Sequence, residues 1–224
     1  MRLVNKAMCE VIVLKAAQEL TSKEYSTLLT LTSDRRKERI ERFMHRQDAY
    51  NCLLGDILTR IEVCRVTQLS NRELKFTQND YGKPLLINNP NIHFNISHSG
   101  QYVVCAIADD PIGIDIELIV PVDLRIAERF FSQDEVAYIM EKNQTYRFIE
   151  VWTKKESMIK WVGEGLSKPL QSFSVFDSST DKSIFYSKVF CDGEAVCHTC
   201  FSKNVKPTIK IINTVDLLAM SKNL

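Results

Sequence analysis

Helix-like and strand-like segments follow one another in this chain in an order that repeats, and the repeat limits the folds open to it. One strand-like run is followed by three segments with apolar residues at helical spacing and then by five short strand-like runs. A second series of helical segments and then strand-like runs comes after them. We therefore predict an α+β fold made of two similar halves that meet near residue 112.

Helix-start signals and hydrophobic spacing place the individual elements. Thr21 with Glu24, and Ser132 with Glu135, have the capping-box spacing that begins a helix. The predicted helices lie at about residues 22–31, 34–45, 49–61, 124–131, 133–142 and 145–161. The predicted strands lie at about residues 3–15, 74–76, 85–87, 92–96, 102–108, 112–117, 172–177, 184–190, 195–201 and 208–212.

The composition is that of a globular protein without a strong charge. Hydrophobic residues make up 45% and charged residues 25% of the 224 residues, which excludes disorder and collagen-like repeats. The 29 basic and 28 acidic side chains leave a formal charge of +1, so we expect no nucleic-acid or membrane partner. The 7 cysteines lack framework spacing, no signal-peptide pattern precedes them, and the apolar run 11–14 is far shorter than a membrane span. We expect a soluble, reduced, cytoplasmic protein.

Asp115 and Glu117 form the first candidate site. They alternate with Ile114 and Ile116, so in a strand the two carboxylates share one face while the isoleucines point into the core. Two carboxylates this close repel each other unless a cation lies between them, and oxygen ligands suit Mg²⁺ or Mn²⁺ better than Zn²⁺. The alternative is the exposed face of an edge strand.

Glu156 and Lys160 form the second candidate site, on the helix expected at 145–161. Together with Trp152 they lie on one helical stripe, so a carboxylate and an ammonium leave the same face. The alternative is a surface ion pair at the favourable i, i+4 spacing, worth only about 0.3–0.5 kcal/mol.

Three further segments have residue types suited to phosphate or nucleotide binding. Ser97 and His98 lie at the end of a strand-like run before a glycine that is free to turn, where a hydroxyl, an imidazole and backbone N–H groups can cradle a phosphate. Arg36 and Arg39 lie one helical turn apart in a basic helix, and the turn at 81–84 offers an aromatic ring and a cation. The alternatives are a plain turn, a solvated helix face and a turn that binds nothing.

Cys197, His198 and Cys200 raise the possibility of a zinc site. The two cysteines lie three residues apart in a strand-like run, so they face opposite sides, and no second pair supplies the other ligands. We predict buried free thiols instead.

Read in series, the segments RRKERIERF, YGKP, FNISHSG, IGIDIE and WTKKESMIKWVGEGL resemble the 4′-phosphopantetheinyl transferases of the surfactin-synthetase type. The resemblance runs from about residue 30 to 175. It implies a monomer of two similar α/β halves in a pseudo-twofold arrangement, each with helices packed on a mainly antiparallel sheet. It assigns residues 1–112 to the half on the coenzyme A adenine and 3′-phosphate side, and residues 113–224 to the half with the metal-binding acids and the catalytic helix.

The resemblance also implies a reaction and its residues. Phosphopantetheine would move from coenzyme A to a serine of an apo peptidyl or acyl carrier protein, with Mg²⁺ or Mn²⁺ present, and adenosine 3′,5′-bisphosphate would leave. Glu156 would accept the serine proton, and Lys160 would stabilise the departing phosphate. The implied set is Asp115, Glu117 and Glu156 for the metal, Lys160, Ser97 and His98 for the phosphates, Tyr81, Gly82, Lys83 and Pro84 on the adenine side, and Arg36 and Arg39, where the family often has lysine, for the 3′-phosphate.

The carrier and the rival functions follow from weaker signals. Because the net charge is near zero, we expect apolar contacts to matter in carrier docking, and we assign part of the docking edge to residues 118–135, including Val120, Val122, Leu124 and Phe130 or Phe131. One rival is a Mg²⁺-dependent phosphohydrolase that uses the same acids with water as the nucleophile. The other is a coenzyme A-binding module in which the acids are solvated.

Overall fold

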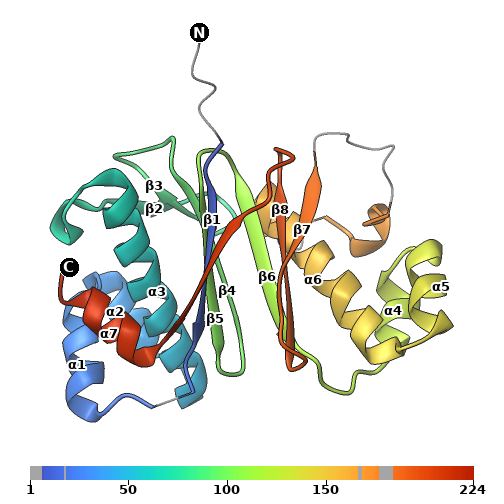
Figure 1. Cartoon of the computed structure of the whole chain (residues 1–224), viewed down its shortest axis with the longest axis horizontal. Helices are drawn as coiled ribbons and strands as arrows, with labels where there is room; N and C mark the ends of the chain where they lie inside the picture. The colour runs from blue at the N-terminus through green and yellow to red at the C-terminus, as the bar shows by residue number, and fades with distance from the viewer. Residues whose placement is uncertain (1–6, 18, 166–167, 177–183) are drawn as a thin grey trace, which may run out of the picture.

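Two sheets lie against each other in the middle of the molecule and carry helices on their outer sides (Figure 1). The computed structural model describes residues 7–224 except residues 18, 166–167 and 177–183. Helices α1, α2, α3 and α7 cover one side, and α4, α5 and α6 cover the other (Figure 1). The predicted α+β fold of two similar halves is therefore confirmed.

The first sheet has the strand order β4-β5-β1-β9. Its strands are β1 (Cys9–Lys15), β4 (His93–Ser99), β5 (Tyr102–Ala108) and β9 (Thr208–Asn213). Its helices are α1 (Ser22–Thr30), α2 (Asp34–Glu41), α3 (Arg46–Thr67) and α7 (Thr214–Ser221). A 3₁₀ turn (Asn71–Glu73) leads to a separate hairpin of β2 (Phe76–Gln78) and β3 (Pro84–Leu86).

The second sheet has the strand order β6-β8-β7 and is antiparallel throughout. Its strands are β6 (Ile112–Leu118), β7 (Phe185–Cys191) and β8 (Ala195–Phe201). Its helices are α4 (Arg125–Phe130), α5 (Gln133–Glu141) and α6 (Gln144–Val162), followed by a 3₁₀ turn (Leu170–Ser172).

Alternating side chains of the central strands build the core. Val11 and Val13 of β1 pack against Ile114 and Ile116 of β6 between the sheets, while Leu14 packs with the helices of the first half. A strand sends successive side chains to opposite faces, so both faces of each sheet are used. The two halves therefore share one buried apolar layer.

Two sequence predictions about the second half differ from the structure. The strand predicted at 172–177 is instead the end of a 3₁₀ turn followed by irregular chain up to residue 176, and residue 177 lies outside the described residues. The strand predicted near 208–212 exists, but it pairs in parallel with β1 in the first sheet rather than in the second. The boundary between residues 112 and 113 stays a prediction.

Candidate functional site

The two predicted acids of β6 and the helix α6 are brought together by a glycine. The α6 backbone lies so close to β6 that a Cβ added at Gly113 would be 1.9 Å from the Ser157 carbonyl oxygen. Asp115 and Glu117 leave the face of β6 opposite to Ile114 and Ile116, which pack between the sheets. This is the face that the helix covers, so the only residue without a Cβ is required at position 113 for the close approach.

Glu156 of α6 lies within electrostatic reach of both acids. Burial raises the pKa of the Glu156 carboxyl, and the negative charges of Asp115 and then Glu117 raise it further. Burial and the charge of Asp115 likewise raise the pKa of Glu117. Three carboxylates from two elements therefore share one partly desolvated space, in which a cation would relieve their repulsion.

Asp115 has one oxygen engaged and one without a partner. Its Oδ1 accepts hydrogen bonds from Lys160 Nζ at 2.6 Å and from Ser97 Oγ at 2.8 Å, whereas Oδ2 is buried with no hydrogen-bond partner. A buried carboxylate oxygen without a partner is costly, and Mg²⁺ is a ligand that such an oxygen suits.

These acids fit a magnesium ion by their donor type and by this free oxygen. Within the described ranges of the chain, no three His, Cys, Asp or Glu side chains already stand in a metal-coordinating arrangement. Asp115, Glu117 and Glu156 are the residues that would hold the ion.

Strand β4 binds the acids of β6 through side chains rather than through a backbone ladder. Asn95 Oδ1 accepts the Ile114 N–H at 2.9 Å, Ser97 Oγ donates to Asp115, and Ser99 Oγ donates to Glu117 at 2.8 Å. These three residues are spaced by two, so they share a face. His98 lies on the other face of β4 and is exposed, so the structure separates it from Ser97.

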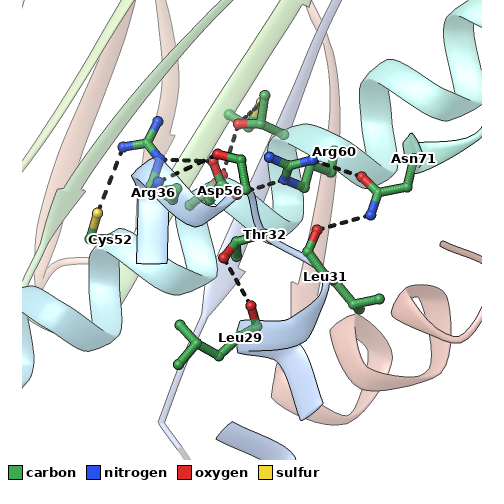
Figure 2. A network of polar contacts seen from close by, with 12 residues as sticks. Leu29, Leu31, Thr32, Arg36, Cys52, Asp56, Arg60 and Asn71 are labelled. Carbon is green, nitrogen blue, oxygen red and sulfur yellow. Dashed lines mark hydrogen bonds and ion pairs between the residues drawn. The ribbon is translucent and has the colours of Figure 1, made fainter. Parts of the chain in front are cut away.

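Arg36 is held by a network of polar side chains between α2, α3 and the 3₁₀ turn (Figure 2). Its Nε lies 2.9 Å from Asp56 Oδ1, and Asp56 Oδ2 accepts from Arg60 Nε at 2.6 Å. Arg60 in turn donates to Asn71 at 2.8 Å, and Asn71 donates to the Leu31 carbonyl at 2.9 Å. Asp56 and Arg60 are buried, whereas Arg36 keeps 21% of its side chain exposed.

Two adjoining cavities of about 390 Å³ each lie beside this network. Both are lined by Arg36 and Arg39, and one is bounded by α2, α3 and the β2–β3 hairpin. The other reaches from these arginines past the 81–84 turn to Lys160 on α6. The predicted basic pair, the hairpin turn and the catalytic lysine therefore line one connected surface.

Lys83 lies in this wall, but its ammonium points at backbone. Its Nζ donates to the carbonyls of Lys160 at 2.6 Å and Trp161 at 3.0 Å. Burial lowers the pKa of Lys83 to about 8. Tyr81, in the same turn, is 58% exposed, and Gly82 has φ +85°, which a residue with a side chain rarely adopts.

The cysteines of β8 are free and buried. Cys197 packs between the sheets, whereas Cys200 packs with the helices of the second half, which confirms that they face opposite sides. His198 Nδ1 lies 2.8 Å from the Thr153 hydroxyl in the core, where burial lowers the pKa of the imidazole to about 3.

Several residues of the site were not predicted from the sequence. Asp56 and Arg60 lie in a helix that was read as an apolar stripe, although a charged pair at i, i+4 inside such a stripe was a signal. Ser99 shares the spacing of Ser97, which would have assigned it to the same face. Asn79 had no signal, because its partner lies in the other half of the chain.

Comparisons with known proteins agree over both halves. A family model described as "4'-phosphopantetheinyl transferase, N-terminal" matches residues 19–110, and one described as "4'-phosphopantetheinyl transferase superfamily" matches residues 111–212. In the part of the chain that the structure describes, no helix is both long and apolar enough to cross a membrane.

Curated relatives carry the same name. The 4'-phosphopantetheinyl transferase Sfp of Bacillus subtilis (strain 168) is 45% identical over 159 residues, which cover 70% of this chain and 71% of that protein. The 4'-phosphopantetheinyl transferase gsp of Aneurinibacillus migulanus is 38% identical over 181 residues, covering 80% and 76%. This chain is therefore an enzyme of the 4′-phosphopantetheinyl transferase family.

Proposed function

We propose that this enzyme acts as a monomer and moves the 4′-phosphopantetheine group of coenzyme A onto a serine of an apo peptidyl or acyl carrier protein, with Mg²⁺ or Mn²⁺ present. Family membership supports this class of reaction. The observation that carries the proposal is the convergence of three carboxylates on Lys160, at one end of a cavity that Arg36 and Arg39 line at its other end.

The transfer balances as one substitution at phosphorus. The serine Oγ bonds to the phosphorus that carries pantetheine, the bond from that phosphorus to the bridging oxygen breaks, and adenosine 3′,5′-bisphosphate leaves with the electron pair. Glu156 accepts the serine proton, directly or through a water, and its raised pKa makes it the better acceptor. Bound Mg²⁺ would neutralise charge on the pyrophosphate.

Lys160 is placed to stabilise the leaving phosphate. Its ammonium is held 2.6 Å from Asp115 and 2.8 Å from Ser97, and 28% of its side chain remains exposed. A fixed cation at the cavity wall lowers the energy of developing negative charge without a reorganisation step. Ser97 therefore acts by orienting Lys160 and Asp115 as well as by its own contact with phosphate.

The opposite end of the cavity takes the nucleotide part of coenzyme A. Arg36 and Arg39 bind the 3′-phosphate, and the guanidinium of Arg36 is oriented by Asp56. The turn at 81–84 lines the adenine side. His98 is assigned to a phosphate only through the family motif.

A Glu156→Gln variant tests the assignment of the base. We expect transfer from coenzyme A to fall by about 10²-fold or more, because a general base contributes roughly 10² to 10⁴-fold, while the melting temperature stays close to wild type. Glu150→Gln is the matched control, since Glu150 lies on the same helix and pairs with Lys154 and Tyr138 instead. Normal turnover of Glu156→Gln would remove Glu156 from the mechanism.

The carrier docks on the segment that follows β6. Val120, Ile126 and Phe130 are exposed there by 48%, 37% and 40%, whereas Phe131 belongs to the core. Exposed apolar groups beside the acids suit a partner whose serine has to reach Glu156.

A Phe130→Ser variant tests this edge. We expect the KM for the carrier to rise by roughly 10-fold with kcat and the KM for coenzyme A unchanged, as for loss of an aromatic anchor. Val215→Ser, an equally apolar and exposed change on α7 of the first half, serves as the control. An unchanged carrier KM in Phe130→Ser would place docking elsewhere.

A further inference from the structure

The ammonium of Lys83 is surrounded by three carbonyl groups of the second half. Its Nζ lies 2.6 Å from the Lys160 oxygen, 3.0 Å from the Trp161 oxygen and 3.4 Å from the Ile112 oxygen. Lys160 and Trp161 belong to the last turn of α6, whose carbonyls have no partner within the helix, and Ile112 begins β6. A cation at the C-terminal end of a helix is also favoured by the helix dipole.

Asn79 extends the same contact to the residue that ends the helix. Its Nδ2 donates to the Gly163 carbonyl at 2.8 Å, while its Oδ1 accepts the Lys83 N–H at 2.9 Å. Gly163 has φ +79°, and a Cβ there would lie 2.8 Å from Lys83 Cδ. The hairpin turn of the first half therefore fits closely onto the end of α6.

The number of donors decides what Lys83 can bind. An ammonium has three N–H donors, and three carbonyls of this chain already accept from it. Arg36 differs, because Asp56 takes only its Nε and 21% of the side chain is exposed at the cavity. A phosphate would have to displace Lys83 from the helix end, whereas it can approach Arg36 directly.

We propose that Lys83, with Asn79, is a positioning residue that clamps the C-terminal turn of α6 and the start of β6, and so fixes Lys160 relative to Asp115, rather than a phosphate contact. This rests on the proposed function for the role of Lys160. Because the clamp joins the nucleotide-binding turn to the catalytic helix, losing it slows transfer without changing recognition of the 3′-phosphate.

The test compares two donors in a Lys83→Met variant, which keeps the length of the side chain and removes its hydrogen-bond donors. We expect kcat for carrier modification to fall on the order of 10-fold with both coenzyme A and 3′-dephospho-coenzyme A, as for a displaced catalytic group. The ratio of kcat/KM between the two donors stays within about 2-fold of wild type. Arg36→Ala is the matched control, in which this ratio falls by about 10-fold or more.

Two outcomes overturn the clamp. One is a ratio in Lys83→Met that falls as it does in Arg36→Ala, because Lys83 would then bind the phosphate. The other is unchanged kcat together with unchanged amide hydrogen exchange over residues 156–165. We expect faster exchange there in Lys83→Met, and a smaller effect of the same sign in Asn79→Ala. Exchange needs no substrate, so it judges the clamp even if the wild-type enzyme transfers nothing, which would count against the proposed function alone.

Discussion

At the scale of single residues, Asp56 shows how a charge in the core serves a charge at the surface of the site. It is 8% exposed and receives both Arg36 and Arg60, so two guanidinium groups share one carboxylate and a positive excess remains beside the cavity. Arg60 is itself 6% exposed and lies 5.3 Å from the Phe76 ring centre. Removing the carboxylate would leave this buried cation without its anion, which is more costly than losing one hydrogen bond.

Asp56→Asn is therefore expected to lower the free energy of unfolding by about 3 kcal/mol, the usual loss when one partner of a buried ion pair is removed. Urea unfolding followed by circular dichroism measures it. Glu38→Gln breaks the exposed Glu38–Arg42 pair and should change stability by less than about 0.5 kcal/mol. Equal effects in the two variants would show that the buried network does not stabilise the fold.

At the scale of elements, local signals in the sequence predicted helices better than strands. The capping box of Thr21 and Glu24 forms as predicted at the start of α1, because its bonds lie within four residues. The strand predicted at 172–177 was wrong, since the chain there bends to bring the Leu170 and Phe173 carbonyls to Lys155 Nζ at 2.7 Å each. That buried lysine also pairs with Glu135 at 2.8 Å, and no local pattern around residue 172 reports it.

The contact of α6 with β6 gives the prediction at this scale. In Gly113→Ala the new Cβ would lie 1.9 Å from the Ser157 oxygen and 2.5 Å from the Trp161 nitrogen, both backbone atoms, so the helix must move. We expect a loss of about 1–3 kcal/mol in unfolding free energy, as for an overpacked core, and a loss of transfer activity.

Gly55→Ala provides the matched control for this change. Its Cβ would meet only side chains, at 3.4 Å and 3.6 Å, and alanine favours a helix over glycine by roughly 0.5–1 kcal/mol. A Gly113→Ala variant as stable and active as Gly55→Ala would contradict the close approach of α6 to β6.

At the scale of the whole molecule, contacts between distant parts of the chain decide how the two halves sit. Tyr102 of the first half donates to Asp192 at 2.5 Å and to Glu194 at 2.7 Å in the β7–β8 turn, and β9 returns to pair with β1. Sequence motifs predicted which residues carry chemistry, since each motif is local. They did not predict that Lys83 contacts α6 or that Asp56 holds Arg36, because neither pairing leaves a periodic pattern in the chain.

The most direct test of the transfer is the intact mass of an apo peptidyl carrier domain after incubation with this enzyme, coenzyme A and Mg²⁺. We predict a gain of one phosphopantetheine that is lost when EDTA is added and in a carrier whose acceptor serine is replaced by alanine. Cleavage of coenzyme A with an unmodified carrier would instead indicate a hydrolase, and neither change across peptidyl and acyl carriers would indicate a binding module. Either of these results would contradict the proposed transfer.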